Sequence, residues 1–197
     1  MAYVRIAQLW DGSPVAASEC VELHLRLRED GALKIHIDAP FHRDPPPEGA
    51  AGSYAGLWNH EVVEVFLVGE DGRYTEAEFG PHGHYLVLEL TAPREVQREG
   101  ETIALAVERK RDRWQGRAML PAHLLPERIV RVGAFAIHGT DHGSGQGAGT
   151  ARRYLSAHTL PGPRPDFHQP DTFPLLTSDD LRRAPPGTAR SDATDSR

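Results

Sequence analysis

The sequence predicts an all-β protein, an antiparallel β sandwich with long loops rich in proline and glycine. Along much of the chain, apolar and polar residues alternate with the period of two that marks a strand with one buried face. These short segments are separated at regular intervals by glycine, proline or charged turn residues, as in sandwiches. Segments with the 3.6-residue period of an amphipathic helix are scarce.

The first clear strands form a predicted hairpin. Residues 19–27 alternate between apolar and polar side chains, and Gly31 turns the chain into a second alternating segment, residues 33–37. Cys20 is the only cysteine, so no disulfide can form within the chain, and we expect it to be a packing residue.

A long loop and a central strand follow this hairpin. Residues 38–56 contain four prolines and three glycines, which block strand pairing and predict a loop. Residues 61–68 are apolar on both faces apart from two glutamates, which predicts a central strand. Further strands are predicted at residues 74–79, 85–90, 103–108, 113–120 and 130–138.

The length of 197 residues suits one domain, and we assign residues 1–176 to a single β sandwich. Residues 177–197 consist mainly of Ser, Asp, Arg, Pro, Thr and Ala, so we expect a disordered tail. The glycine-rich residues 139–150 predict a mobile loop, because ordering glycine costs more backbone entropy than ordering other residues.

Charge and hydropathy narrow the range of partners and compartments. The net charge is −6 and the basic residues are scattered among acids, which argues against a nucleic-acid partner. The chain lacks an apolar stretch approaching the roughly 18 residues of a membrane span, and it starts without the pattern of a signal peptide. We therefore expect a cytoplasmic protein with no membrane partner, whose oligomeric state the sequence leaves open.

Carboxylates mark the start of the predicted central strand. The segment LWNHEVVEVF places Trp58 just before the strand and sends Glu61 and Glu64 to opposite faces of it. A buried Glu64 needs a partner, because a buried charge without one is costly. It is either a structural residue paired with an arginine or a contact to a ligand or metal.

The next predicted strand carries Tyr74, Glu76 and Glu78 on one face. Such a row of oxygen acceptors suits sugar hydroxyls or a hard cation, but it is also typical of an ordinary solvated face.

Histidines provide a candidate metal site. His82 and His84 lie two residues apart in a turn, and His138 is followed by Asp141 and His142. Imidazole and carboxylate groups bind transition metals when three or more converge. The candidate metal ligands are therefore Glu64, His82, His84 and His138, and the alternative is that these histidines are structural or exposed.

The segment from residue 152 to residue 168 adds an arginine that suits anions and an aspartate that could orient a histidine. Trp58 and Tyr74 offer aromatic surfaces for stacking against a sugar ring. The candidate ligand-binding set is Trp58, Glu61, Tyr74, Glu76, Glu78, His82, His138, Arg153, Tyr154, Asp166 and His168.

The motifs of three common enzyme classes are missing from the sequence. It lacks GxGxxG, GxxxxGK[ST] and GxSxG, which disfavours dinucleotide, P-loop and serine-hydrolase sites. No catalytic residue can be assigned.

Several sequence blocks resemble an uncharacterised family. The blocks APFHRDPPP, LWNHEVVEVFLV, YTEAEFGPHGHYLVLEL, FAIHGT, RRYLSAHTLP and PDFH, within residues 39–173, resemble uncharacterised protein family 0462, which occurs in bacteria and animals. That family has no assigned biochemistry, so the resemblance implies no activity. We expect a bacterial source for this chain.

A more distant similarity connects the Trp-x-x-Glu strand and the Tyr-x-Glu strand with family 9 carbohydrate-binding modules and DOMON-like β sandwiches. This similarity implies a carbohydrate-binding-module-like sandwich that binds sugars or haem on one face and often holds calcium. Matched residue by residue, it indicates Trp58, Glu61, Glu64, Tyr74, Glu76, Glu78 and His82.

We therefore predict a non-catalytic ligand-binding domain whose partner is a small molecule, a saccharide or polyol. Two alternatives stay open: a metal-dependent, hydrolase-like enzyme with a His/Glu cluster, and a structural or partner-binding scaffold. No cofactor is certain, and a divalent metal, calcium or zinc, remains an alternative. The identity of the ligand cannot be derived from the sequence.

Overall fold

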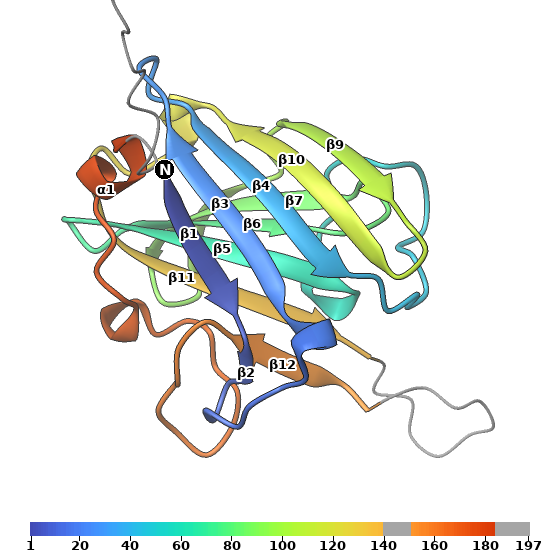
Figure 1. Ribbon diagram of the computed structural model, residues 1–197. Coiled ribbons are helices and arrows are strands. Elements are labelled where there is room, and N and C mark those ends of the chain that lie inside the picture. Colours follow the sequence, from blue (N-terminus) through green and yellow to red (C-terminus); the bar gives the residue numbers. More distant parts are fainter. Residues whose placement is uncertain (140–150, 184–197) are drawn as a thin grey trace, which may run out of the picture.

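Two antiparallel β-sheets are stacked face to face in a computed structural model that describes residues 1–139 and 151–183 (Figure 1). The predicted antiparallel β sandwich is confirmed. One sheet contains β1 (Ala2–Ile6), β3 (Val21–Leu27), β4 (Leu33–Pro40), β10 (Arg113–Leu120) and β9 (Ala104–Arg109), in that order. The other contains β2 (Gln8–Leu9), β12 (Arg153–Ser156), β11 (Ile129–His138), β5 (Val62–Gly69), β6 (Tyr74–Phe79), β7 (Tyr85–Ala92) and β8 (Glu95–Glu99).

Short helical segments connect these strands. They are η1 (Ala17–Glu19), η2 (Leu57–Asn59), η3 (Ala122–Leu124), η4 (Pro170–Thr172) and α1 (Ser178–Arg182). Within residues 1–139 and 151–183, none of the helices combines the length and the apolar character that crossing a membrane requires.

The sequence prediction missed β1, β2, β8 and β12 and ended β4 too early. All five residues of β8 are exposed, so this strand exists through pairing with β7 and leaves no pattern of burial in the sequence. The expected loop at residues 38–56 begins only after Pro40, because Asp38 continues the strand and accepts a hydrogen bond from Gln115 on β10 (2.9 Å).

The main hydrophobic core lies between the two sheets. It is built from the inward rows of both sheets, such as Leu23 and Ile35 from one and Val65 and Phe79 from the other. Trp114 is also buried there. Cys20 is buried as well.

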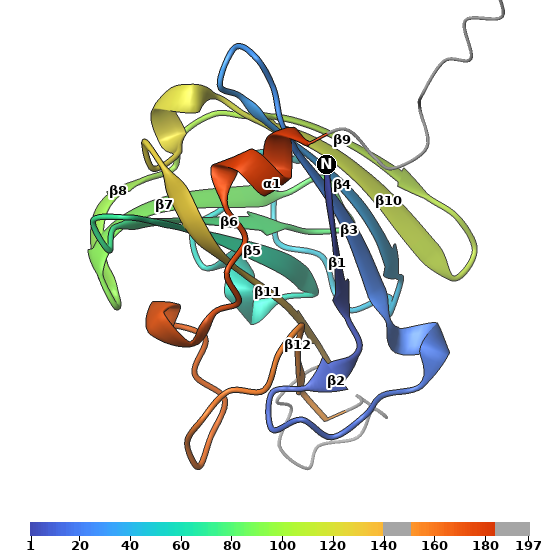
Figure 2. The same cartoon turned by 60° about the vertical axis from the view of Figure 1, so that its left-hand side comes forward.

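The seven-stranded sheet is also covered on its outer face. Phe66 on β5 and Phe135 on β11 pack there against Phe167 and Phe173, from the segment that follows β12. This segment runs along β11 toward α1 (Figure 2). Every residue of β5 is consequently buried, which confirms the predicted central strand.

The predicted disorder from residue 177 onward is wrong for residues 177–183. Thr177 caps α1 through a capping box with Asp180, and Leu181 is fully buried against the five-stranded sheet. One apolar side chain and a satisfied cap order a segment whose composition is almost entirely polar. The rest of the predicted tail, 184–197, lies outside the described residues, as do positions 140–150 of the predicted mobile loop.

Replacing Leu181 with alanine tests whether α1 belongs to the folded unit. Because Leu181 is 0% exposed, Leu181→Ala should lower the free energy of unfolding by about 2–4 kcal/mol, measured by urea denaturation. The control Leu175→Ala removes a side chain that is 72% exposed and should change that free energy by less than about 0.5 kcal/mol. Equal effects of the two substitutions would contradict the assignment of α1 to the fold.

Candidate functional site

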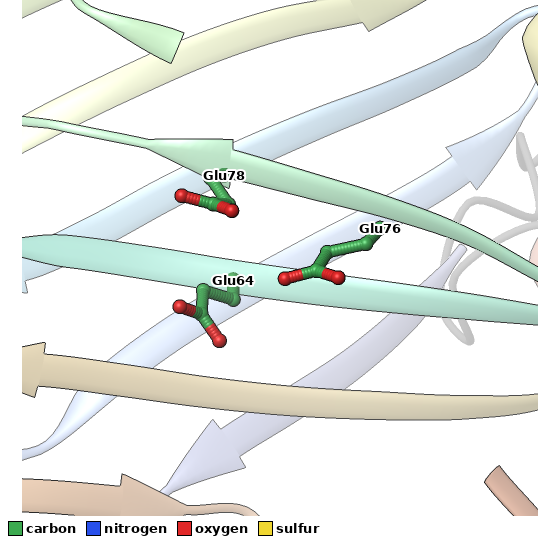
Figure 3. Close-up of side chains that lie close together, drawn as sticks. All are labelled: Glu64, Glu76 and Glu78. Atoms are coloured by element: carbon green, nitrogen blue, oxygen red, sulfur yellow. The ribbon is translucent and has the colours of Figure 1, made fainter. Parts of the chain in front are cut away.

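The pairing of β5 with β6 brings three glutamates together on the outer face of the seven-stranded sheet. Glu64 lies directly opposite Glu78 in the antiparallel register, and Phe66 lies opposite Glu76. Glu76 and Glu78 share a face because they are two residues apart on one strand. Carboxylate oxygens of the three glutamates lie within 4.8 Å of one another (Figure 3).

These three carboxyl groups are deeply buried. Glu64 is 2% exposed, Glu76 is 3% exposed and Glu78 is 0% exposed. Both oxygens of Glu78 and Oε2 of Glu76 have no hydrogen-bond partner among the described residues. Like charges directly opposite each other in a sheet are destabilising, and burial removes the water that would screen them.

The electrostatics of the cluster disfavour three free carboxylates. Burial raises the pKa of Glu76 to about 7. Burial, and then the charge of Glu76, raise the pKa of Glu64 well above its ordinary value. The pKa of Glu78 is raised by burial and by both neighbours, and the Trp58 backbone N–H opposes this only weakly. At neutral pH the cluster therefore requires protons or a compensating positive charge.

A cavity of about 400 Å³ adjoins this cluster. Glu64 and Glu76 line it, so carboxyl groups from two strands face its interior. The other lining residues are aromatic, aliphatic or charged: Trp58, Leu88, Leu90, Arg94, Val96, Ile137, Tyr154, Pro165, Asp166, Phe167 and His168. A larger hollow of about 790 Å³ near α1 has only polar and charged lining residues and no aromatic surface.

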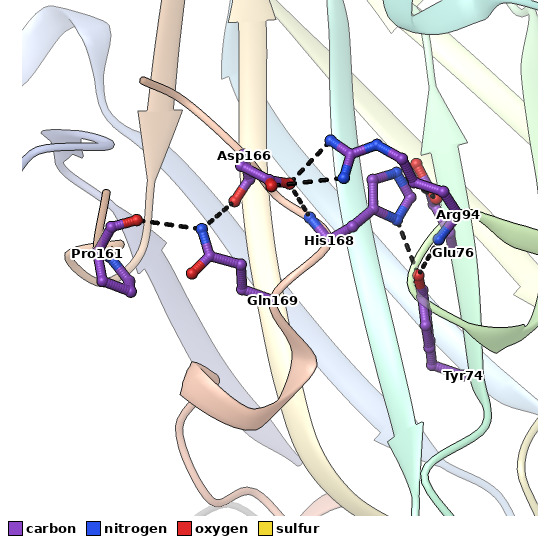
Figure 4. Close-up of polar contacts among 7 residues, drawn as sticks. All are labelled: Tyr74, Glu76, Arg94, Pro161, Asp166, His168 and Gln169. Atoms are coloured by element: carbon purple, nitrogen blue, oxygen red, sulfur yellow. Dashed lines mark hydrogen bonds and ion pairs between the residues drawn. The ribbon is translucent and has the colours of Figure 1, made fainter. Parts of the chain in front are cut away.

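A polar network links the segment after β12, which carries Asp166 and His168, to the sheet at this cavity (Figure 4). Arg94 forms an ion pair with Asp166 (2.9 Å), and the Asp166 carboxylate also accepts a hydrogen bond from the His168 backbone N–H (3.0 Å). The Tyr74 hydroxyl lies 2.8 Å from Nδ1 of His168. The segment is thus tied to β6 and to the turn after β7.

The proton positions in this network follow from its geometry. The Arg94 backbone N–H donates to the Tyr74 hydroxyl oxygen (3.4 Å), so the hydroxyl proton is free to bond Nδ1 of His168. Burial raises the pKa of Tyr74 to about 12, and burial followed by Arg94 lowers the pKa of His168 to about 4. When the Tyr74 hydroxyl donates to Nδ1, neutral His168 carries its proton on Nε2, which lies 3.9 Å from Oε2 of Glu76 and beyond hydrogen-bond distance.

The structure brings together seven of the eleven ligand-binding candidates. Trp58, Glu76, Tyr154, Asp166 and His168 line the cavity. Tyr74 and Glu78 adjoin the same place through the contacts described above.

The remaining ligand-binding candidates lie elsewhere. Glu61 accepts hydrogen bonds from the backbone N–H groups of His42 (2.9 Å) and Asp44 (3.3 Å), so it holds the loop after β4. His138 stacks on His42 with ring centroids 3.5 Å apart. Arg153 forms an ion pair with Glu19 (3.0 Å), so its guanidinium already has an acidic partner.

The predicted metal set of Glu64, His82, His84 and His138 does not converge. Among the described residues, only the three glutamates place three such ligand atoms within 4.8 Å of one another. His82 contacts Arg109 through Nδ1 (2.7 Å), and His84 packs edge-on against Tyr54. The turn after β6 carries these two histidines, and His138 ends β11 beside His42. Asp141 and His142 lie outside the described residues.

Sequence reasoning missed Arg94 and Arg152. Arg94 occupies a left-handed turn (φ 63°) between β7 and β8, a position that no periodic pattern reveals. Arg152 donates to the backbone carbonyl oxygens of Trp58 and Asn59 and lies 5.6 Å from the centre of the Tyr154 ring. Arg152 directly precedes the candidates Arg153 and Tyr154 in the sequence, and this position is the feature that could have identified it.

Comparison with known proteins identifies the family, although no family model matches the chain. The UPF0462 protein C4orf33 homolog of Rattus norvegicus is 35% identical over 178 residues, covering 86% of this chain and 84% of the rat protein. The chain belongs to the UPF0462 family. The human UPF0462 protein C4orf33 is 35% identical over 173 residues, covering 83% of this chain and 82% of the relative.

These relatives correct one expectation. The UPF0462 proteins that match this chain are from rat, human, mouse and zebrafish, so the expected bacterial source is contradicted. The resemblance of the sequence blocks to uncharacterised protein family 0462 is confirmed by these relatives.

One solved structure supports the fold of this UPF0462 protein. It is a "putative carbohydrate-binding protein" from Bacteroides uniformis, with a TM-score of 0.58 and 14% sequence identity. The match covers 90% of this chain and 86% of the other. At this level of identity the likeness shows a shared β-sandwich fold and nothing more.

The buried His138 predicts a specific pH dependence of stability. Burial, then His42 and Arg153, lower the pKa of His138 to about 3. The unfolded chain binds this proton below about pH 6.5 and the folded chain only near pH 3, so stability falls as the pH drops through that window. At pH 5 this one group should cost about 2 kcal/mol relative to pH 7.

The variant His138→Gln isolates this contribution. The decrease in unfolding free energy between pH 7 and pH 5, from urea denaturation, should be about 2 kcal/mol smaller in the variant than in the wild type. Glu61, whose pKa burial raises to about 7, contributes with the opposite sign but is present in both proteins. An identical pH dependence of the two proteins would show that His138 does not titrate as described.

Proposed function

We propose that this UPF0462 protein binds a small polyhydroxylated ligand, a saccharide or polyol, in the cavity beside the three glutamates and does so without catalysis. The observation that supports this is the combination of an aromatic surface and carboxylate acceptors in one cavity. Its volume of about 400 Å³ lies at the lower end of small-molecule sites, which favours a small ligand.

The aromatic part of the cavity suits the apolar face of a sugar ring. Trp58 is 43% exposed although it lies next to a buried region, and Tyr154 and Phe167 line the same cavity. Arg152 binds the backbone at Trp58 and stacks on Tyr154, so it holds both aromatic residues in place. A fixed ring that is open to solvent is what stacking against a saccharide requires.

The polar part of the cavity suits hydroxyl groups, which both donate and accept hydrogen bonds. Glu64 and Glu76 provide acceptor oxygens inside the cavity. Arg94 and Asp166 provide a donor and an acceptor that are partly exposed at its edge. A polyol can pair with both kinds of group, whereas a purely apolar ligand would leave the carboxyl groups without partners.

The fold supports this proposal at the level of analogy. The Bacteroides uniformis protein with the same fold carries the description of carbohydrate binding, but a shared fold does not fix a ligand. The proposal of a saccharide or polyol ligand therefore depends on the residues that line the cavity.

Replacing Trp58 tests the proposal. The protein is screened against a saccharide and polyol panel by isothermal titration calorimetry, and the best ligand is then titrated into Trp58→Ala. Loss of the stacking surface should weaken binding at least tenfold, about 1.4 kcal/mol. The control Tyr3→Ala removes an exposed aromatic residue (52%) from the other sheet and should leave affinity unchanged. The proposal fails if no panel member binds, or if both variants bind as tightly as the wild type.

A further inference from the structure

We propose that Glu64, Glu76 and Glu78 form a binding site for one hard divalent cation of the Ca²⁺, Mg²⁺ or Mn²⁺ class. This site does not depend on saccharide binding, because its ligands are the three carboxyl groups themselves. It also differs from the His/Glu set that the sequence suggested, since it shares only Glu64 with that set.

The geometry of the cluster suits such an ion. Carboxylate oxygens bind Ca²⁺ at about 2.3–2.6 Å and Mg²⁺ at about 2.0–2.1 Å, so oxygens on opposite sides of one ion lie about 4–5 Å apart. The oxygens of the three glutamates lie within 4.8 Å of one another. Two paired central strands hold them, and Figure 3 shows the three side chains next to one another on this face of the sheet.

Glu78 needs a partner that the described protein does not supply. Its side chain is 0% exposed and is aimed into the cluster, and neither carboxylate oxygen has a partner at normal hydrogen-bond geometry among the described residues. The Trp58 backbone N–H and the Glu76 carboxyl group lie only near enough to influence its pKa. No lysine or arginine within residues 1–139 and 151–183 forms an ion pair with any of the three glutamates. Buried polar groups in folded proteins are nearly always paired, so these oxygens require a bound group or a shared proton.

The local charge balance favours a divalent ion over a monovalent one. The acids beside the cavity are the three glutamates and Asp166. The cations are Arg94, which pairs with Asp166, and Arg152, whose charge acts on Glu64 without direct contact. When all three glutamates are ionised, these acids exceed the two arginines by two charges, which one divalent cation neutralises and one ammonium group does not.

The chemistry of the ligands separates hard cations from zinc. All three ligands are oxygens, which suit Ca²⁺, Mg²⁺ and Mn²⁺, whereas zinc sites in proteins use mainly histidine and cysteine. Nε2 of His168 lies 3.9 Å from Oε2 of Glu76, beyond hydrogen-bond distance. Nδ1 of the same ring is already in contact with the Tyr74 hydroxyl (2.8 Å).

The cavity gives the ion access and further ligands. Glu64 and Glu76 belong to the cluster and also line the cavity of about 400 Å³, which is the route by which we expect an ion to reach the site. Three carboxylates leave coordination positions unfilled, and water or a ligand hydroxyl can occupy them.

Calorimetric titration with cations alone tests the site. The full chain, purified without a histidine tag, is dialysed against chelator and then titrated at pH 7.5 with Ca²⁺, Mg²⁺ and Mn²⁺ separately. We expect saturable binding of one cation per chain. Glu78→Gln, which keeps the shape and removes one charge, should weaken binding at least tenfold. The control Glu22→Gln changes an exposed acid on β3 and should bind as the wild type does.

Two results would overturn the site: no uptake of any of the three cations at millimolar concentration by the wild type, or equal affinity of Glu78→Gln and the wild type. Circular dichroism checks the fold of the variant, and Glu64→Gln replaces it if Glu78→Gln does not fold. The saccharide titration is separate, so cation binding without saccharide binding would refute the proposed function and leave the cation site standing.

Discussion

The cross-strand pair of Glu64 and Glu78 is the constraint on which the site depends. These two carboxyl groups face each other on a sheet that is buried on both faces, and Glu76 stands beside them. Opposed like charges in such a place are unfavourable unless protons or a cation compensate them. The described chain supplies no lysine or arginine partner for the Glu78 oxygens, so protons or a bound cation must compensate the cluster. A cavity lined by Glu64 and Glu76 adjoins it.

The segment after β12 completes the core and shapes the cavity at the same time. Phe167 and Phe173 close the apolar part of the outer face by packing on Phe135. Toward the glutamates the same segment changes character, and Asp166 and His168 turn to polar contacts with Arg94 and Tyr74. The segment thus packs on the apolar part of the outer face and borders the cavity beside the buried glutamates. The segment after β12 therefore contributes both to the apolar packing on this face and to the lining of the cavity.

Much of the fold and part of the site could be predicted from the sequence, because period-two alternation fixes both the strands and their faces. The faces of Glu64 and of Glu76 and Glu78 were assigned correctly, but their convergence also depends on strand register, which the short turn between β5 and β6 sets. Arg94 could not be found, since its place depends on a turn conformation. The histidines were grouped by spacing alone, which does not report distance in the fold, and α1 was missed because one leucine orders a polar segment.

An anomalous difference map from crystals of the protein grown with Mn²⁺ tests the cation site most directly. A bound ion should give a strong peak about 2.0–2.6 Å from carboxylate oxygens of Glu64, Glu76 and Glu78. A map without a peak there, in which the three carboxyl groups instead hydrogen-bond only to one another, would contradict the cation site. In that case shared protons, and no cation, would compensate the buried charge.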